Sequence, residues 1–303
     1  MVKLNKIYLK IKSRKKIGRD VLMETFKLNN GVEIPKLGIG TFQMEPEVAE
    51  KAVVDALKDG YHLIDTANGY MNEKAVGRAI KESGIKREDI FISSKLWPTV
   101  YEDENAIDDT LKRLGIDDID LLFLHQPAGN WEKGYKQIEK AYKEGKVKAI
   151  GISNFHDEKL RKLFEMAEIK PQVMQVEAHP YFPETELKEF LKPYGTRIMA
   201  WYPLGHGDAS LINEPVFSEL GKKYHKSNVQ IILRWHIQEG NIVIPGSTNP
   251  AHIKANADIF DFSLSAEDMA EIAKINKNKR YYIPSDSLEE SYANMKMDFN
   301  SQK

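Results

Sequence analysis

IFISSKLWPTVYEDENAIDDTLKRLGIDDIDLLFLHQ, residues 90–126, is the stretch that decides the fold. It contains two short apolar runs, 90–96 and 120–126, separated by the amphipathic segment ENAIDDTLKRLG (104–115). Short apolar runs predict buried strands, and the segment between them predicts a helix with an acidic first turn and an end at Gly115. A strand, a helix and a second strand in this order predict a βαβ unit with parallel strands.

The same pattern repeats along the chain from residue 35 onward. The other apolar runs are LGIGT (37–41), HLIDTA (62–67), AIGISNF (149–155), VMQVEAH (173–179), RIMAWYP (197–203) and NIVIPGS (241–247). Eight strands alternating with helices predict an α/β fold, the closed (β/α)₈ TIM barrel. The alternative is an open doubly wound sheet, which usually carries G-x-G-x-x-G after its first strand. Here GIGTFQ (38–43) lacks the third glycine.

Segments at both ends add to the predicted barrel. FKLNNGVEIPKLG (26–38) predicts a β-hairpin with a two-residue turn at Asn30-Gly31, placed as a plug at the barrel's N-terminal end. After the eighth strand, 251–260 and 265–277 predict helices. The tail 278–303 has no clear period, and such tails are often disordered. Its aromatic pair, Tyr281 and Tyr282, suggests that part of it packs near the mouth, as an extra helix and loop.

Composition places the chain among globular proteins and excludes several classes. It has 303 residues, 42% hydrophobic and 29% charged, with a formal net charge of −1, so we expect no attraction to nucleic acid. The absence of cysteine excludes disulfides, thiolate catalysis and cysteine metal sites, and it fits a reducing compartment, the cytoplasm. No apolar run approaches the roughly 18 residues of a membrane span. We predict a monomer with one domain over residues 23–303.

The first 22 residues stand apart from the rest. They carry eight lysines and arginines and one acid, Asp20, and they lack the continuous apolar core of a secretory signal. One interpretation is a targeting or surface-binding arm. The other, which we favour, is a disordered extension or a misassigned start with Met23 as the true one.

Four titratable residues follow adjacent predicted strands: Asp65, Tyr70, Lys95 and His125. Functional side chains of a (β/α)₈ barrel lie at the C-terminal strand ends, so we expect these four to converge. Each has a structural alternative. Asp65 could cap the next helix, Tyr70 could be an ordinary loop tyrosine, and His125 could be a core histidine.

Together the four residues form a coherent chemical set. A lysine beside Tyr70 is expected to favour the phenolate and lower the tyrosine pKa, while Asp65 keeps Lys95 charged. Tyr70 then becomes a usable general acid for an alkoxide that forms from a carbonyl group. His125 can donate a hydrogen bond to the carbonyl oxygen. The set offers no metal cage and no serine–histidine–acid triad.

A series of segments in chain order matches one known family. They are GIGTF, DTANGY with NEKAVGRAI, SSKLW, LLFLHQP, GKVKAIGISNF, PQVMQVEAHP, AWYPLG and IPGS followed by Asn256. Over residues 24–280 the chain thus resembles the aldo-keto reductases. The resemblance implies carbonyl reduction with a nicotinamide cofactor bound without a Rossmann motif. It also implies that Tyr70 donates the proton, Lys95 tunes it, Asp65 pairs with Lys95, and His125 orients the carbonyl.

The resemblance further implies a set of cofactor contacts. Ser153, Asn154 and Gln175 would hold the carboxamide, and Trp201, at a position usually occupied by tyrosine, would stack on the nicotinamide. Tyr202 replaces the usual small serine in the pyrophosphate loop. The other expected contacts are Thr41, Phe42, Pro203, Leu204, Gly205, Pro245, Gly246, Ser247, Thr248, His252 and Asn256.

The loop after the eighth strand departs most from the family pattern. The family's NADPH enzymes place a lysine and an arginine where this chain has Gly246 and His252. Both cations neutralise the adenosine 2′-phosphate, and each lost charged contact is worth roughly 1.5–3 kcal/mol. We therefore predict a cofactor of NADP(H) or NAD(H), with weak discrimination in favour of NADPH. Alternatively, Lys254 or another nearby cation substitutes.

A further group of residues is expected to line the substrate side of the site. They are Phe42, Tyr70, Trp97, His125, Gln126 and Trp131. The segment 127–135 is short, which predicts an open pocket for small aldehydes, α-dicarbonyls or keto-sugars, although Trp131 could instead cap the following helix. Two other function classes stay open: a cofactor-sensing regulatory subunit, and a Schiff-base enzyme that uses Lys95.

Overall fold

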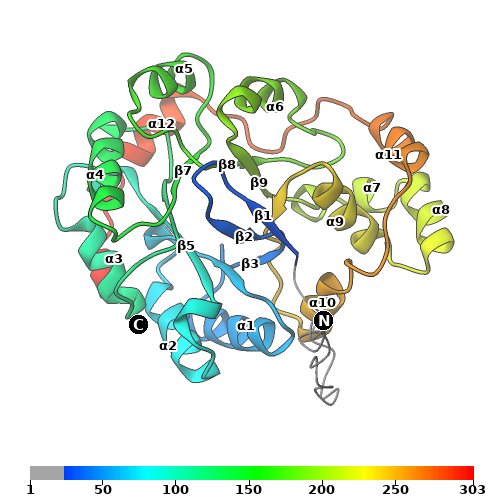
Figure 1. Cartoon of the computed structure of the whole chain (residues 1–303), viewed down its shortest axis with the longest axis horizontal. Coiled ribbons are helices and arrows are strands. Elements are labelled where there is room, and N and C mark those ends of the chain that lie inside the picture. Colours follow the sequence, from blue (N-terminus) through cyan, green and yellow to red (C-terminus); the bar gives the residue numbers. More distant parts are fainter. Residues whose placement is uncertain (1–23) are drawn as a thin grey trace, which may run out of the picture.

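The computed structural model describes residues 24–303, so the predicted basic extension lies outside the described residues. Eight parallel strands form one sheet in chain order. They are β3 (Gly38–Gly40), β4 (Leu63–Asp65), β5 (Phe91–Leu96), β6 (Leu121–Leu124), β7 (Ile150–Ser153), β8 (Val173–Glu177), β9 (Arg197–Trp201) and β10 (Ile242–Val243). A parallel bridge between Leu37 and Val243 joins the two edges of the sheet. The predicted (β/α)₈ barrel is confirmed (Figure 1).

Helices surround the barrel in the spaces between successive strands (Figure 1). They are α1 (Pro46–Lys58), α2 (Glu73–Ser83), α3 (Ala106–Leu114), α4 (Trp131–Lys143), α5 (Asp157–Met166), α6 (Thr185–Leu191), α7 (Ala209–Ile212), α8 (Pro215–Tyr224), α9 (Asn228–Gln238), α10 (Pro250–Ala257), α11 (Ala266–Ala273) and α12 (Asp286–Ala293). The helix expected over 104–115 is α3, and it ends at Gly115, whose φ of 67° suits a residue without a Cβ.

The hydrophobic core has two layers. The outer layer lies between the strands and the helices, whereas the inner layer fills the barrel with side chains such as Leu63, Phe91 and Phe123. Leu28 and Ile34 of the N-terminal hairpin belong to the same inner cluster. The hairpin therefore plugs one end of the barrel, as predicted, and leaves the opposite end for polar chemistry.

The hairpin strands are β1 (Thr25–Lys27) and β2 (Glu33–Pro35), but the prediction of a two-residue turn was wrong. Leu28 N donates to Val32 O at 2.8 Å, and Gly31 N donates to Leu28 O at 2.9 Å, so the loop has three residues. Gly31 has a φ of 90°. This is a turn followed by a glycine bulge, the other common solution for a loop that ends in Asn-Gly.

The C-terminal tail forms the predicted extra helix and loop, and its suspected disorder is not observed. Helix α12 lies on the mouth side, where the Glu289 carboxylate accepts from His156 Nε2 at 2.8 Å and also bonds Lys159. The backbone N–H groups of Tyr281 and Tyr282 donate to Glu177 at 2.7 and 2.8 Å. The tail lacked periodicity because polar anchors, and not a long amphipathic helix, hold it in place.

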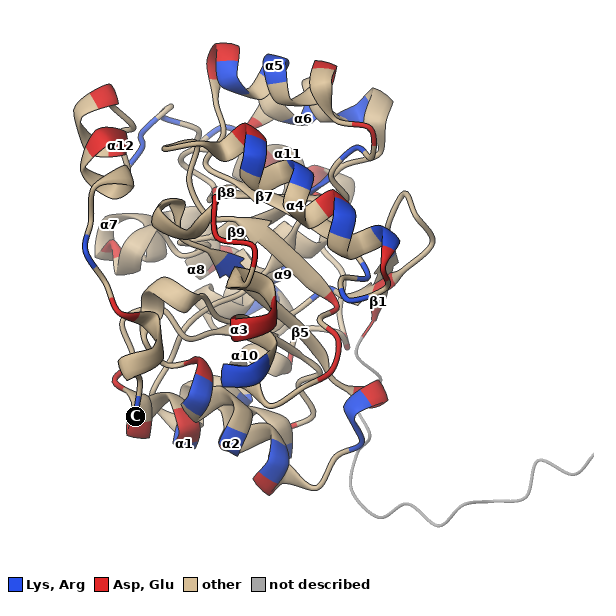
Figure 2. Ribbon diagram, turned by 90° about the vertical axis from the view of Figure 1, so that its left-hand side faces the viewer, with Lys and Arg blue, Asp and Glu red and all other residues tan. Residues whose placement is uncertain are grey.

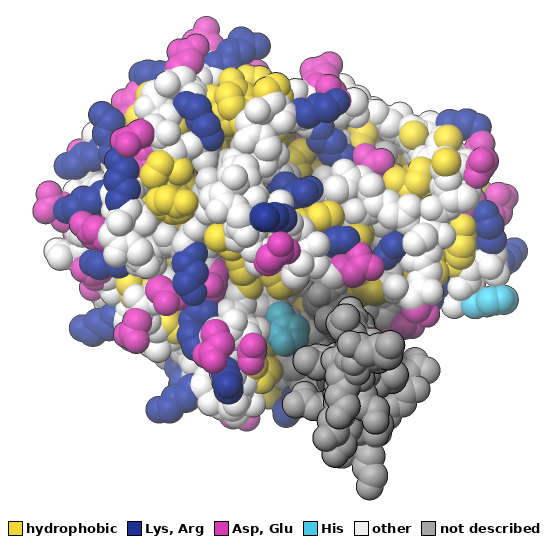
Figure 3. Space-filling view, viewed as in Figure 1, with side chains coloured by type: hydrophobic (Ala, Val, Ile, Leu, Met, Phe, Trp, Pro, Cys, Tyr) yellow, Lys and Arg dark blue, Asp and Glu magenta, His cyan; other side chains and the backbone are white. Residues whose placement is uncertain are grey.

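The outer surface mixes charges of both signs. Acidic and basic positions are spread along the outer helices in Figure 2, and the face in Figure 3 shows them side by side around the rim. Within residues 24–303, no helix has the length and apolar character that crossing a membrane requires.

Candidate active site

The four predicted catalytic residues lie at neighbouring strand ends. Asp65 is the last residue of β4, Lys95 lies near the end of β5, and His125 directly follows β6. Tyr70 ends the short 3₁₀ helix η1 (Asn68–Tyr70) in the loop after β4. The alternative that Asp65 caps a helix does not hold, because η1 and α2 begin after other residues.

Lys95 and Asp65 form a buried ion pair at the centre of this group. Lys95 Nζ donates to Asp65 Oδ2 at 2.6 Å and to the backbone oxygen of Thr66 at 2.8 Å. The other carboxylate oxygen, Oδ1, accepts from Ser93 Oγ at 2.8 Å and from Gln175 Nε2 at 3.1 Å. Burial lowers the pKa of Lys95, and the Asp65 charge opposes that shift. The pair is thus a fixed positive charge with little freedom to move.

Tyr70 lies directly above this charge. Lys95 Nζ is 4.7 Å from the centroid of its ring. The ring also contacts Phe42 at 5.1 Å and His125 at 5.4 Å between centroids. The expected fall in the tyrosine pKa was wrong for the protein alone. Burial, with Asp65 and Tyr202 adding negative charge, raises the pKa of Tyr70 well above its usual value, so its phenol is protonated at neutral pH.

His125 is held as a neutral ring. Burial, reinforced by the Lys95 charge, lowers the pKa of His125 well below its usual value. Its Nδ1 is buried and finds no hydrogen-bond partner within residues 24–303. Trp97 contacts the ring edge-on at 4.9 Å between centroids. A neutral imidazole in this position can donate one N–H hydrogen bond toward the mouth.

The residues expected to hold a nicotinamide ring lie on the next strands. Trp201, at the end of β9, is half-buried, and its Nε1 donates to Asn154 Oδ1 at 3.0 Å. Asn154 Nδ2 in turn donates to Gln126 Oε1 at 3.1 Å. Gln175 reaches Asp65, and Ser153 is buried. The half-exposed aromatic face and the amides beside it fit a flat, amide-bearing ring, although the Asn154 amide is already engaged by two side chains.

The expected pyrophosphate loop follows β9 and contacts the tail. Asp208 Oδ2 accepts from Lys279 Nζ at 2.7 Å and from the Tyr281 hydroxyl at 2.5 Å. A Cβ at Gly205 would lie 3.2 Å from the Tyr281 ring. It would also lie 2.7 Å from Leu211 Cδ2, and the φ of 61° further favours glycine here. Thr41, another expected cofactor contact, is buried, and its hydroxyl donates to the Asp65 backbone oxygen at 3.2 Å.

The loop after β10 is open to solvent. Gly246 and His252 are exposed, whereas Asn256 is buried on the inner side of α10. Lys254 is also exposed. Within the described residues, no hydrogen bond or ion pair engages the side chain of either His252 or Lys254.

The predicted substrate residues divide into two groups. Phe42, Trp97 and Gln126 join the cluster around Tyr70 and His125, and Phe42 is 49% exposed at the mouth. Trp131 is instead the first residue of α4, where it packs against the Phe155 ring in the outer core. The alternative that Trp131 caps the helix is also wrong, because the N-cap is Asn130, whose side chain accepts from Lys133 N.

The structure places Tyr282 of the tail at the mouth, as expected, and adds Tyr292 and Ser93, which the sequence did not indicate. Tyr282 contacts the Trp201 ring at 5.5 Å, and the Tyr292 backbone oxygen accepts from Trp97 Nε1 at 3.1 Å, so the tail contributes to the mouth. Ser93 could have been found, because it lies two residues before Lys95 and alternate strand residues share a face. The aromatic pair of the tail pointed to the mouth, but no sequence signal identified its partners, since they lie far away in the chain.

A barrel with a buried lysine–aspartate pair under a tyrosine and a neutral histidine has the features of a carbonyl-acting oxidoreductase. Comparison with known proteins agrees. The family model described as "Aldo/keto reductase family" matches residues 36–277. A glyoxal reductase of Bacillus subtilis is 44% identical over 267 residues, which are 86% of this chain and 95% of that protein.

Solved structures give the same result. An aldo/keto reductase from Brucella melitensis superposes with a TM-score of 0.80 and 43% identity, covering 84% of this chain and 100% of that one. An aldo-keto reductase of Bombyx mori in complex with NADP gives a TM-score of 0.83 at 31% identity, covering 90% and 99% of the two chains. The chain belongs to the aldo-keto reductase family. It is an oxidoreductase that acts on CH–OH and C=O groups and binds a nicotinamide cofactor.

Proposed function

We propose that the protein reduces aldehydes or ketones to alcohols with Tyr70 as the general acid. The observation that carries this proposal is the buried Lys95–Asp65 pair, whose ammonium lies 4.7 Å from the Tyr70 ring centroid. A phenol with a raised pKa keeps its proton until a strong base is beside it. An alkoxide that forms at a reduced carbonyl is such a base.

In the proposed reaction, the bound nicotinamide supplies a hydride to the carbonyl carbon. Neutral His125 donates a hydrogen bond to the carbonyl oxygen and fixes its direction. As negative charge develops on that oxygen, it takes the proton of the Tyr70 hydroxyl. The Lys95 ammonium then stabilises the resulting phenolate, and Asp65 keeps Lys95 in place. The tyrosine regains its proton from solvent before the next turnover.

The proposed cofactor site runs from β7 to α10. Ser153, Asn154 and Gln175 would hold the carboxamide, Trp201 would stack on the ring, and the loops 202–205 and 245–248 would hold the phosphates. Support comes from the half-exposed Trp201 face beside the Asn154 amide.

We further propose weak discrimination between NADPH and NADH. The exposed loop after β10 offers Gly246 and a histidine without full charge where two cations would otherwise neutralise a 2′-phosphate. The expected kcat/KM ratio of the two cofactors is near one. A preference for NADPH of about a hundredfold at neutral pH would contradict this, since about 2.7 kcal/mol requires at least one strong charged contact to the 2′-phosphate. The double variant Gly246→Lys/His252→Arg should shift the ratio toward NADPH.

Small aldehydes, α-dicarbonyls and keto-sugars are the proposed substrates. Support comes from Phe42, Trp97 and the tail residue Tyr282, which place aromatic rings around the mouth. The name of the Bacillus subtilis relative, a glyoxal reductase, agrees with an α-dicarbonyl.

One assay tests the proposed reaction. Absorbance at 340 nm should fall when the protein is mixed with NADPH or NADH and methylglyoxal or a nitrobenzaldehyde. Tyr70→Phe should lower kcat severely while cofactor binding, followed by fluorescence titration, changes little. Substantial activity in Tyr70→Phe would rule out the acid assignment. Cofactor binding without turnover would favour a regulatory role, and borohydride trapping of a carbonyl compound on Lys95 would favour Schiff-base chemistry.

A further inference from the structure

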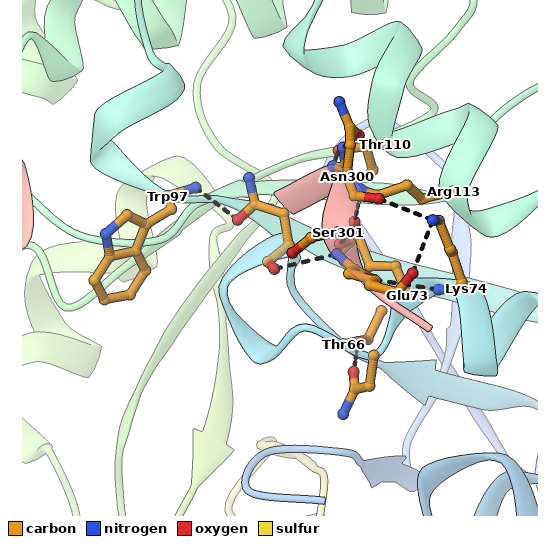
Figure 4. A network of polar contacts seen from close by, with 12 residues as sticks. Thr66, Glu73, Lys74, Trp97, Thr110, Arg113, Asn300 and Ser301 are labelled. Carbon is orange, nitrogen blue, oxygen red and sulfur yellow. Dashed lines mark hydrogen bonds and ion pairs between the residues drawn. The ribbon is translucent and has the colours of Figure 1, made fainter. Parts of the chain in front are cut away.

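The last residues of the chain are buried against the loop that carries Tyr70. Phe299 and Gln302 are 6% and 5% exposed, although they lie within five residues of the C-terminus. Figure 4 shows Asn300 and Ser301 beside Arg113, Glu73 and Lys74, at the start of α2. Chain termini are usually frayed unless specific contacts hold them.

Gln302 contacts both sides of the Tyr70 loop with a single side chain. Its Nε2 donates to the backbone oxygen of Asn68 at 3.4 Å, two residues before Tyr70. Its Oε1 accepts from the backbone N–H of Lys74 at 3.3 Å, four residues after Tyr70. Lys74 Nζ also donates to the Gln302 backbone oxygen at 2.8 Å. The Gln302 side chain therefore links the two ends of the loop 68–74 by hydrogen bonds.

Asn300 extends the same contact to the first turn of α2. Its Oδ1 accepts from Arg113 Nη1 at 2.9 Å, and its backbone oxygen accepts from Lys74 Nζ at 2.9 Å. Arg113 Nε donates to Glu73 Oε2 at 2.6 Å, inside a buried ion pair. The end of the chain is thus built into a polar network that fixes where α2 begins.

The position of Tyr70 depends on this loop. Within residues 24–303, no hydrogen bond holds the Tyr70 hydroxyl, so the ring is placed by its backbone and by its aromatic neighbours. On the substrate side, the loop is held by Asn68 Oδ1, which accepts from the backbone N–H of Trp97 at 2.9 Å. Gln302 supplies the tie on the opposite, outer side.

We propose that Gln302 is a positioning residue for Tyr70, so that the segment 299–302 completes the active site. The inference rests on the proposed role of Tyr70 as general acid. Removing the hydrogen bonds of Gln302 lets the loop move, which lengthens the path of the proton from the phenol to the substrate oxygen. Cofactor binding does not involve this loop face and stays unchanged.

The test is Gln302→Ala in the full-length protein, with Gln302→Met as the variant that keeps the side-chain length without hydrogen bonds. Both should lower kcat by about three- to tenfold, because misplacing a reacting group by a fraction of an ångström costs rate steeply. Both should also raise the solvent deuterium isotope effect on kcat/KM, since proton transfer becomes slower. The dissociation constant of the cofactor should not change.

Ser301→Ala is the matched control, because within residues 24–303 the Ser301 hydroxyl bonds only the nearby Asp298 backbone oxygen, at 2.7 Å. It should behave as the wild type. Wild-type kcat in Gln302→Met would show that packing alone suffices, and an unchanged isotope effect in Gln302→Ala would show a purely structural role. If Tyr70→Phe is inactive, either result would overturn the positioning role of Gln302 and leave the acid assignment of Tyr70 intact. Activity in Tyr70→Phe would instead overturn the acid assignment and the positioning role together.

Discussion

Two buried ion pairs lie on opposite faces of strand β5. Inside the barrel mouth, Lys95 Nζ is 2.6 Å from Asp65. Outside, between α2 and α3, Arg113 Nε is also 2.6 Å from Glu73. Both pairs are buried, and both connect residues at least thirty positions apart. Distance and burial therefore do not distinguish a catalytic pair from a structural one.

The difference lies in what each cation faces. The other two nitrogens of Arg113 donate to Thr110 and Asn300 at 2.9 Å, so every nitrogen of this cation bonds a protein group. Lys95 instead faces the ring of Tyr70, whose hydroxyl no described residue engages. A buried charge directed at a group with a free proton is poised for chemistry, whereas a fully satisfied charge holds helices together.

The largest effect is expected for Lys95→Met. It removes the charge beside Tyr70 and leaves Asp65 buried with neutral partners only. We expect kcat to fall by about 10²–10⁴ and the free energy of unfolding to fall by about 3–5 kcal/mol. Steady-state kinetics and urea titration measure the two quantities.

Lys143→Met is the control for this loss. Lys143 and Glu168 also lie 2.6 Å apart, but both side chains are at least half exposed. Exposed pairs contribute only about 0–1 kcal/mol, so this variant should keep nearly wild-type stability and kcat. An equal loss of stability in Lys95→Met and Lys143→Met would mean that burial does not determine how much an ion pair stabilises the protein.

Arg113→Met should break the outer pair and lower stability as much as Lys95→Met does, but it should affect kcat far less. Glu73 would remain buried, and burial already raises the pKa of Glu73 against the opposing effect of Arg113. The unfolding free energy should fall by about 3–5 kcal/mol, while kcat should fall by at most about tenfold, through the loop that Glu73 supports. A loss of kcat as large as that of Lys95→Met would contradict the division between the two pairs.

Sequence reasoning could find the inner pair but not the outer one. Asp65 and Lys95 end apolar runs, so the barrel rule alone brings them together. Glu73 and Arg113 instead lie in helical segments rich in charge, where a charged residue usually faces solvent. Only packing of α2 against α3 turns them toward each other. The polar anchors of the tail, such as Gln302, could not be predicted for the same reason, since they meet partners more than two hundred residues away.

The pKa of Tyr70 shows a related limit. Pairwise reasoning from Lys95 predicted a fall, because an opposite charge favours the phenolate. In the folded protein, burial dominates and raises the pKa. Burial depends on how Phe42 and His125 pack over the ring, which no local pattern of residues reveals.

Buried histidines, which are neutral groups and not paired charges, should affect the pH dependence of stability. Burial lowers the pKa of His236 to about 3, and its Nε2 lies 2.9 Å from the Pro203 backbone oxygen. The unfolded chain binds a proton near pH 6.5, so below that pH it binds more protons than the folded protein. Stability should therefore fall as the pH drops from about 6.5 toward 3, by about 1.4 kcal/mol per pH unit for His236.

Urea titrations between pH 7 and 4 measure this slope. His236→Gln should reduce the slope of stability against pH by the contribution of one histidine. It should also lower the stability at pH 7, because the hydrogen bond to the Pro203 backbone oxygen is disturbed. His125, whose pKa is also lowered by burial, should contribute in the same direction. A stability that rises on acidification through this range would contradict the neutral state of both rings.

The smallest effects compare two adjacent serines that serve the two pairs. Ser93 Oγ donates to Asp65 Oδ1 at 2.8 Å on the inner face of β5, and Ser94 Oγ donates to Glu73 Oε1 at 2.6 Å on the outer face. Each serine hydroxyl donates to a charged carboxylate, so Ser→Ala at either site should lower the free energy of unfolding by about 1.5–3 kcal/mol at most. The two variants should therefore lose similar stability.

The kcat values of the two serine variants should differ. This difference separates the catalytic effect of the inner pair from its effect on stability. Ser93→Ala loosens Asp65 and, through it, Lys95, so kcat should fall several-fold and the pH profile of kcat should shift. Ser94→Ala loosens only the outer pair and should leave kcat near the wild-type value. Because the two residues are neighbours of the same type, buried to the same extent, differences in packing largely cancel. If both variants lost the same fraction of kcat, the face of the strand would not matter, and the assignment of one pair to chemistry and the other to structure would fail.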